Sequence, residues 1–367
     1  EAMAVIWVSG NRALFPTGLF SFIRTLTTNI VMEMGYATNI HRSALIATGL
    51  VLLVLVLIIT LSMNLVPKEF KGKRGNKVLH GDASAKPVFR KKGALPMVGA
   101  IFGMVCAGIV GAMLLLIILY ILISGVGCLT ADFLFGEASI NEPTLGPALL
   151  ATLELIGITL VIALPVGICA AIYLNEYAKK GSKIVKVIRT FIDTLSGVPS
   201  IVFGLFGYLL FVQIFGRSVF AGAFTMVLVI LPTIIRSTEE ALRAVPMELR
   251  EASYGLGASK IRTIFKVVLP SAFPGIATAI VLSVGRIISE SAALIYTAGM
   301  MAVASSSVSS AIDPTNAGST LTVFMYSFFA EGLAYEEAYA TAFVLLIITF
   351  VLNLIVYFIQ KSVKKKR

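Results

Sequence analysis

Long apolar runs separated by polar segments are the main pattern in this chain of 367 residues. A helix needs ~20 mostly apolar residues to cross a bilayer, because each residue adds about 1.5 Å along the helix axis. Seven runs reach or approach this length: Ser43–Val66, Pro96–Ser124, Ala148–Leu174, Ser200–Phe215, Val219–Ile235, Phe273–Ala298 and Ala338–Gln360. Glu1–Ser9 has the pattern of the outer end of an eighth helix, so we expect the sequence to be part of a longer chain. The pattern predicts an all-α polytopic membrane protein.

Composition agrees with this class and excludes a soluble enzyme. Hydrophobic residues make up 57% of the chain and charged residues only 13%, about half the charged share of a soluble domain. The cysteines Cys106, Cys128 and Cys169 have no metal-ligand spacing. No G-x4-G-K-[ST] phosphate-binding loop and no Ser-His or H-E-x2-H grouping occurs, so the chain cannot hydrolyse ATP by that route. We expect a protein that is not an enzyme, with no metal site or cofactor of its own.

The basic residues lie mainly on one side of the predicted spans. Residues 67–95, 175–199, 236–272 and 361–367 hold 25 of the 30 Lys and Arg, whereas the alternate segments hold four. Positive charge collects in cytoplasmic loops, so the C-terminal tail is predicted to be cytoplasmic. Charge spread over four segments beside spans also argues against nucleic-acid binding. Residues 67–95, with nine basic residues and no helical period, are predicted to form a flexible cytoplasmic linker.

The chain contains an internal repeat, which joins residues 1–66 to residues 290–360. Two pairs of segments align in the same order: Glu1–Asn11 with Glu290–Met300, and Arg24–Thr27 with Ser319–Thr322. A Glu-Gly element and an Ala-Thr-rich span follow in both copies. Both copies have the same predicted orientation, so the repeat is parallel. The chain is therefore expected to join the end of one membrane unit to a related second unit.

The polar segment 236–272 is rich in alanine and charge and is predicted to form two helices. Pro246 suits the first turn of a helix that begins near Met247. Gly255 or Gly257 would end this helix, and a second helix would run to a stop at Pro270. An amphipathic helix that lies on the lipid surface is one interpretation.

A second interpretation comes from a family resemblance. The segment resembles the E-A-A-x3-G-x9-I-x-L-P signature of ABC-importer permeases, through Glu251, Ala252, Ser253, Gly257, Val267, Leu269 and Pro270. The chain departs from the signature at Ser253 and Val267, and the spacing is kept. The resemblance implies a type I (MetI-like) helical bundle, with about six spans in the main domain and one or two from a truncated second permease. It also implies that this loop docks on a separate ATPase subunit, which binds ATP and Mg.

Two further stretches narrow the resemblance. Ala170–Tyr177 and Asp193–Gly207 are similar to the phosphate-uptake permeases of the PstA family, over residues 90–367, and residues 1–66 are similar to the C-terminal end of the PstC family. The implied domains are a PstC-like remnant (1–66), the linker (67–95) and a PstA-like permease (96–367). The implied partners are an ATP-binding cassette ATPase, a PstC-like second permease, membrane lipid and a periplasmic or lipid-anchored phosphate-binding protein. The implied location is a bacterial or archaeal plasma membrane.

Ionisable residues within predicted spans are the candidates for the substrate pathway, since such residues are costly in a membrane. Arg286 and Glu290 lie four apart in Phe273–Ala298 and would share a helix face. They form either a self-neutralised structural pair or an anion site, because an Arg fork matches phosphate oxygens. Glu1 is the repeat equivalent of Glu290. Arg236, at the end of Val219–Ile235, is either an interfacial residue or a second anion contact.

The sequence thus predicts the permease subunit of an ATP-driven phosphate importer, which moves phosphate from the outer side to the cytoplasm. Three alternatives stay open. The importer could carry another solute, such as molybdate, sulfate or an amino acid. The chain could be a proton-driven secondary transporter that uses Arg286 and Glu290 as a relay. It could also be a structural or regulatory membrane scaffold.

Overall fold

The computed structural model describes residues 2–15, 17–18, 20–65, 94–136, 144–179, 181–300, 313–331 and 335–365. Within these ranges the backbone forms helices and one isolated bridge between Gly10 and Ile23. Glu1 and nearly all of the predicted linker 67–95 lie outside the described residues. The elements follow in this order: α1 (Ala2–Ser9), α2 (Leu26–Glu33), α3 (Asn39–Leu65), α4 (Ala94–Val126), α5 (Ala131–Phe135), α6 (Gly146–Ile172), η2 (Tyr173–Tyr177), α7 (Lys183–Gly197), α8 (Ser200–Gly207), η3 (Tyr208–Val212), α9 (Gln213–Phe215), α10 (Val219–Arg243), α11 (Met247–Gly255), α12 (Lys260–Thr263), η4 (Ile264–Val268), α13 (Leu269–Ser289), α14 (Ala292–Thr297), α16 (Leu321–Glu331) and α17 (Tyr335–Lys365).

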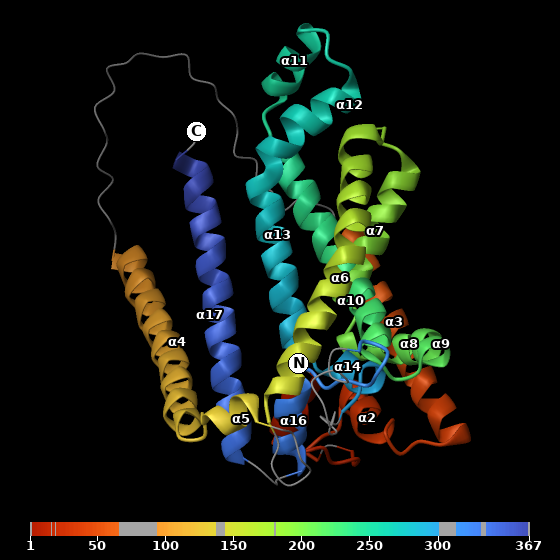
Figure 1. The fold of residues 1–367 in the computed structure, drawn as a ribbon, viewed down its shortest axis with the longest axis vertical. Helices are drawn as coiled ribbons and strands as arrows, with labels where there is room; N and C mark the ends of the chain where they lie inside the picture. The colour runs from red at the N-terminus through yellow and green to blue at the C-terminus, as the bar shows by residue number, and fades with distance from the viewer. Residues whose placement is uncertain are drawn as a thin grey trace.

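Six helical segments of the described chain are long and apolar enough to cross a membrane: Asn39–Ser62, Ile101–Val126, Gly146–Tyr177, Val219–Arg243, Lys260–Ser289 and Tyr335–Ile359. A seventh crossing is possible if the bent pair α7 and α8–α9 counts as one span; its two arms meet at 99°. The predicted span Ser200–Phe215 is therefore too short to cross a membrane alone and would do so only together with the polar helix α7. Figure 1 shows the spans side by side, with α11 and α12 projecting at one end.

Several spans are longer than hydropathy predicts at the end that carries α11. The predicted end at Ile235 is wrong, because α10 continues to Arg243. A helix continues into polar surroundings wherever its backbone bonds can be made, whereas hydropathy detects only its apolar part. Segment 236–272 is therefore two helices set on the extended ends of two spans, and not a separate loop domain.

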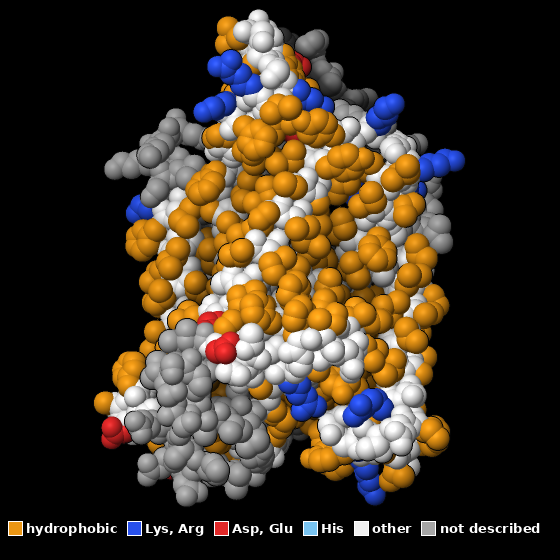
Figure 2. Space-filling view, turned by 45° about the vertical axis from the view of Figure 1, so that its right-hand side comes forward, with side chains coloured by type: hydrophobic (Ala, Val, Ile, Leu, Met, Phe, Trp, Pro, Cys, Tyr) orange, Lys and Arg blue, Asp and Glu red, His pale blue; other side chains and the backbone are white. Residues whose placement is uncertain are grey.

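The helices form a bundle around α10. Most of the α10 span is buried against α6, α8 and α13, whereas no residue in the apolar windows of α4 and α17 is buried within the chain. α4 and α17 pack on each other at one edge of the bundle (Figure 1). Figure 2 shows a broad apolar band around the middle of the molecule, with Lys and Arg side chains above and below it. This arrangement suits a lipid environment, which accepts apolar side chains on the outside of a bundle.

The two copies of the repeat have the same order of elements. α1, α2 and α3 correspond to α14, α16 and α17, and each copy has a glycine with positive φ directly after its first short helix or one residue later. These glycines are Gly10, with φ of 76°, and Gly299, with φ of 130°. The described residues of the two predicted copies therefore share a short helix, a positive-φ glycine, a second short helix and a span, in the same order.

Hydrogen bonds at equivalent positions support the same correspondence. The Ile23 N–H donates to the Ser9 carbonyl at 3.0 Å, and the Gly318 N–H donates to the Ala298 carbonyl at 3.0 Å. Threonine hydroxyls two residues apart also bond at the start of the second helix in each copy, in the pairs Thr25–Thr27 (3.0 Å) and Thr320–Thr322 (3.3 Å). The Thr-Leu-Thr sequence thus has the same structural role twice.

The first copy packs into the main bundle and is not an isolated appendage. Helix α3 lies against α7 and α8, and Ile30 and Leu45 are fully buried in one core with Ile201 and Tyr296. The Tyr296 hydroxyl donates to the carbonyl of Val31 at 2.6 Å, which links α14 of the second copy to α2 of the first. Residues of α1, α2 and α3 thereby share one hydrophobic core with residues of α6, α8, α10 and α14.

The opposite end of the bundle contains a polar contact between two helix ends. Cys128, in the turn after α4, donates to Glu336 Oε2 at 3.4 Å, near the start of α17. Partial burial, followed by this carboxylate, raises the pKa of the Cys128 thiol. The thiol is therefore protonated at neutral pH and reacts slowly as a nucleophile.

Candidate functional site

The E-A-S-x3-G part of the signature forms the end of helix α11. Gly257 has φ of +79°, its N–H donates to the Tyr254 carbonyl at 2.9 Å, and the Ala258 N–H donates to the Ser253 carbonyl at 3.1 Å. This pair of bonds is the Schellman arrangement, which requires a left-handed residue directly after the helix cap. Glycine adopts that conformation without steric cost. The spacing from Ser253 to Gly257 is therefore the spacing of a helix stop, and the predicted end at Gly255 or Gly257 is confirmed.

A short turn after Gly257 returns the chain along α11. Ser259 begins α12 by accepting the Arg262 N–H at 3.4 Å. The Ser253 hydroxyl bonds to the buried hydroxyl of Thr263 at 2.9 Å, so the two helices are joined near the turn. Ser253, one of the two departures from the signature, is therefore a structural contact between α11 and α12.

The predicted helix stop at Pro270 is wrong. Pro270 lies in the first turn of α13, and α12, η4 and α13 form one continuous helical span, Lys260–Ser289. The preceding turn is a π-helix in which the Leu269 N–H donates to the Ile264 carbonyl, five residues back. A proline inside an α-helix lacks the N–H and clashes with the carbonyl four residues before it. The wider π turn removes this conflict, so the helix passes through Pro270.

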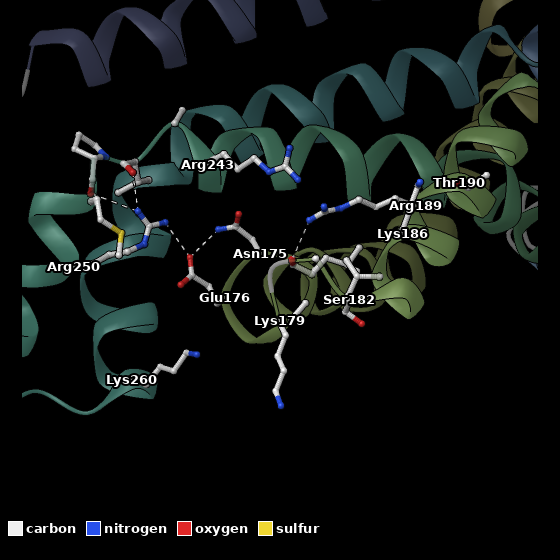
Figure 3. A pocket seen from close by; sticks show the side chains of 18 of the residues that line it. Asn175, Glu176, Lys179, Ser182, Lys186, Arg189, Thr190, Arg243, Arg250 and Lys260 are labelled. Atoms are coloured by element: carbon white, nitrogen blue, oxygen red, sulfur yellow. Dashed lines mark hydrogen bonds and ion pairs between the residues drawn. The ribbon is translucent and has the colours of Figure 1, made fainter. Parts of the chain in front are cut away.

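Arg250 anchors α11 to the rest of the bundle. Its guanidinium donates to the carbonyls of Leu242 (2.9 Å) and Val245 (2.7 Å) and to Glu176 Oε1 (2.9 Å) (Figure 3). The side chains of Arg250 and Glu176 are only 8% and 7% exposed. The Leu242 carbonyl belongs to the last turn of α10 and the Val245 carbonyl to the turn that follows it, a place where backbone acceptors lack helical partners. One residue of the signature helix therefore connects α11, the end of α10 and the π turn η2.

Helices α11 and α12, the turn between them and η4 carry exposed apolar side chains at the tip of the molecule. Leu256 is 90% exposed, and further large apolar side chains of the same segment are also exposed: Met247, Leu249, Tyr254, Ile261 and Phe265. Glu251 and Ala252 are exposed on the same helix. An exposed apolar cluster rimmed by charge is typical of a protein interface.

A second set of ion pairs joins α7 to α10. Glu239 is buried and pairs with Arg189 (2.7 Å) and Arg243 (2.5 Å). Arg236 pairs with Asp193 on α7. The structure therefore shows Arg236 neutralised at the interface between two helices. Any role of Arg236 in contacting an anion stays a prediction.

The structure corrects the expected geometry of Arg286 and Glu290. Helix α13 ends at Ser289, and Glu290 has extended backbone angles of φ −85° and ψ 123°. Glu290 is buried, and its Oε1 accepts the Ala293 N–H at 3.3 Å at the start of α14. Arg286 is exposed in the last turn of α13. The predicted shared helix face is therefore wrong, because the polar Ser-Glu-Ser sequence breaks the helix where hydropathy predicts a continuous span.

Among the described residues, none of the ion pairs includes Arg286 or Glu290. The structure also separates Arg286 from Arg236. Arg236 lies two turns from the end of α10 that leads to α11, and Arg286 lies at the far end of α13. The fourth predicted pathway residue, Glu1, lies outside the described residues. Nothing in the geometry assigns a substrate to these four residues.

Comparison with known proteins identifies the family. The family described as binding-protein-dependent transport system inner membrane component matches residues 163–367, which is more than half of the chain. The chain belongs to this family. It is a multi-pass inner membrane permease, and the predicted fold class is confirmed.

Individual relatives are similar over shorter stretches. The permease is 39% identical over 203 residues to a protein named probable ABC transporter permease YqgI of Bacillus subtilis, covering 54% of this chain and 68% of that protein. It is 44% identical over 155 residues to the phosphate transport system permease protein PstA 1 of Mycobacterium tuberculosis, covering 41% of this chain and 50% of that protein. The match thus spans only half the length of the mycobacterial relative.

A solved structure supports the fold. The bacterial alginate ABC transporter, in complex with a pentasaccharide-bound periplasmic protein, matches with a TM-score of 0.54 at 16% identity. The match covers 74% of this chain and 97% of that chain. At this identity the likeness concerns the fold alone.

Sequence reasoning missed the residues that anchor the signature helix. Arg250 stands directly before Glu251, and Glu176 lies in the stretch Ala170–Tyr177 that resembles the phosphate permeases, but their pairing spans 74 residues. The buried carboxylate Glu239 was likewise not predicted. The sequence did contain a signal for this pairing: an acidic and a basic residue, Glu176 and Arg250, each lie near the polar end of an apolar span. A buried charge without a partner is costly, so such residues are expected to pair.

Proposed function

We propose that this chain is the permease subunit of an ATP-driven importer of inorganic phosphate, with the substrate moving from the outer side to the cytoplasm. The observation that carries the proposal is the 44% identity to a phosphate transport system permease. The family membership supports the coarser role in binding-protein-dependent transport. ATP hydrolysis is assigned to a separate ATPase subunit, because the chain has no phosphate-binding loop of the G-x4-G-K-[ST] type.

The tip formed by α11 and α12 is the proposed docking site for the ATPase. Support comes from the exposed apolar cluster around Leu256 and from the rigid attachment of α11 through Arg250. Force applied to the tip reaches α10 and η2 through Arg250, and reaches α13 through the continuous helix α12–η4–α13. If the ATPase docks here, the end of the bundle that carries α11 must face the cytoplasm. The distribution of basic residues predicts the same side for this end and for the C-terminal end of α17.

Arg286 is proposed as a transient contact for the phosphate anion in the pathway. Its support is an exposed guanidinium within the apolar span Lys260–Ser289, with no ion-pair partner among the described residues. A guanidinium offers a planar fork that matches phosphate oxygens. Glu290 is buried beside the helix break and accepts the Ala293 N–H, so it is proposed to stabilise the local backbone.

A PstC-like second permease and an outer phosphate-binding protein complete the proposed assembly. Helices α1, α2 and α3 have the same order and kind as α14, α16 and α17, and residues 2–65 are proposed to be the C-terminal part of such a second permease. The binding protein would dock at the end opposite α11, where α2 and α16 lie.

The test is uptake of radiolabelled phosphate by cells that lack their own phosphate importer and carry this chain with its partner subunits. We expect ATP-dependent uptake that Arg286→Ala reduces by about ten-fold or more, since a charge-assisted contact is worth more than 1 kcal/mol. Lys183→Gln, an exposed basic residue of α7 outside both the pathway and the proposed docking tip, is the control and should transport normally. Undiminished uptake by Arg286→Ala would exclude the pathway assignment.

The alternatives give different results in the same cells. An importer of molybdate, sulfate or an amino acid would take up that solute and leave phosphate outside. A proton-driven secondary transporter would be inhibited by an uncoupler and would not co-purify with an ATPase. A scaffold would transport none of these solutes under any condition.

A further inference from the structure

A cavity of about 1740 Å³ lies behind the α11 tip, between η2, α7 and the junction of α10 with α11 (Figure 3). Its basic lining residues outnumber its acidic ones by two to one. The basic residues are Lys179, Lys186, Arg189, Arg243, Arg250 and Lys260, and the acidic ones are Glu176, Asp193 and Glu248. The proposed transport role makes no use of this cavity.

The carboxylates in and behind the cavity wall are largely neutralised by arginines. Glu176 pairs with Arg250, Asp193 pairs with Arg236, and the buried Glu239 pairs with two arginines. Lys179 and Lys186 are exposed on the wall, and neither is in an ion pair within the described part of the chain. The cavity therefore has a net positive charge in a partly enclosed space, where the local dielectric strengthens the attraction for an anion.

Hydrogen-bond donors without acceptors accompany this charge. The Nε of Arg189 is buried and has no hydrogen-bond partner among the described residues, although its NH2 bonds to Glu239 and to the Leu174 carbonyl. Ser182 precedes α7 but makes no side-chain bond to the first turn of the helix. An oxyanion with several oxygens can accept bonds from a guanidinium and from first-turn N–H groups simultaneously.

We propose that this cavity binds a phosphate group, supplied either by free inorganic phosphate or by the headgroup of an anionic phospholipid. The cavity is much larger than one phosphate ion, and its wall includes the apolar Leu61 of α3, which leaves room for a headgroup with its glycerol. The site is distinct from Arg286, which lies at the far end of α13. The proposal is derived from the cavity and does not depend on phosphate being the transported solute.

The test uses the full chain, purified and reconstituted into nanodiscs without an ATPase. The first arm measures binding of radiolabelled inorganic phosphate in phosphatidylcholine nanodiscs. The second arm compares thermal unfolding midpoints in phosphatidylcholine and in phosphatidylglycerol nanodiscs. The variant is Lys179→Gln with Lys186→Gln. The matched control is Lys183→Gln. Lys183 is an exposed lysine of α7, as Lys186 is, but it does not line the cavity.

We expect a positive result in at least one arm. The double variant should weaken phosphate binding by about ten-fold, or abolish the stabilisation by phosphatidylglycerol, because two charge-assisted contacts are removed. Lys183→Gln should leave both readouts unchanged. Absence of any effect in both arms, or an equal loss in Lys183→Gln, would overturn the proposal. Binding is measured without transport, so this result is independent of the uptake experiment above.

Discussion

Replacement of Arg250 by glutamine tests the attachment of the signature helix to the bundle. The guanidinium bonds to the carbonyls of Leu242 and Val245 and to Glu176, and both members of the ion pair are less than a tenth exposed. Glutamine keeps a polar side chain but has no charge and is too short to reach all three acceptors. The substitution therefore leaves a buried carboxylate without its counterion.

The expected loss follows from the burial of the pair. Breaking a buried ion pair by removing one partner costs about 3–5 kcal/mol in the free energy of unfolding. Glu176→Gln should cost less, about 1–3 kcal/mol, because Arg250 keeps its bonds to the backbone carbonyls. The double variant should lose less than the sum of the two single losses, by about 0.5–3 kcal/mol, since the two residues share one interaction.

The assay is unfolding of the purified permease in mixed micelles, followed by circular dichroism, for the four members of this cycle. Arg262→Gln, an exposed arginine on the neighbouring helix α12, is the control and should change the free energy of unfolding by less than about 0.5 kcal/mol. Co-purification with the ATPase gives a second readout, because a loosened α11 presents its apolar tip in varied orientations. A loss below about 1 kcal/mol in Arg250→Gln, or strict additivity in the double variant, would refute the anchoring role.

Three further outcomes follow from particular contacts. Gly257→Ala should destabilise the α11 stop by about 1–2 kcal/mol and weaken ATPase co-purification, because alanine disfavours positive φ; Gly255→Ala, in helical backbone with open space around it, is the control and should be neutral or stabilising. Tyr296→Phe should reduce the free energy of unfolding by about 0.5–1.5 kcal/mol, since it removes the bond to the Val31 carbonyl; a wild-type value would show that this contact does not hold α2 in place. A membrane-impermeant maleimide should label Cys128 from outside intact cells, faster as pH rises above neutrality because the raised pKa keeps the thiol protonated there; labelling only after lysis would reverse the predicted orientation.

Much of the fold could be predicted from local sequence. The apolar runs predict most of the spans, because transfer of side chains into lipid depends on composition over about 20 residues. The stop of α11 at Gly257 was predictable for a similar reason, since the stereochemistry of a helix end depends on a few adjacent residues. The repeat was detectable because the same Thr-Leu-Thr hydrogen bonds and left-handed glycines serve both copies.

The helix break at Glu290 shows where prediction from the local sequence fails. Hydropathy joins Phe273 to Ala298 into one span, whereas the helix ends at Ser289 and Glu290 bonds to the start of α14. The Thr322 hydroxyl donates to the Glu290 carbonyl from a segment 32 residues away. The tertiary contact satisfies the backbone at the break, which the sequence around Glu290 alone does not reveal.

The sequence by itself determined the membrane class, the positions of most spans, the repeat and the helix stop in the signature segment. Only the tertiary structure decided that Arg250 pairs with Glu176, that two arginines neutralise Glu239, and that basic residues enclose a cavity behind α11. The physical reason is the range of the interactions. Hydropathy and backbone stereochemistry act between neighbours in the chain, whereas the pairing of buried charges depends on which helix ends the packed bundle brings together.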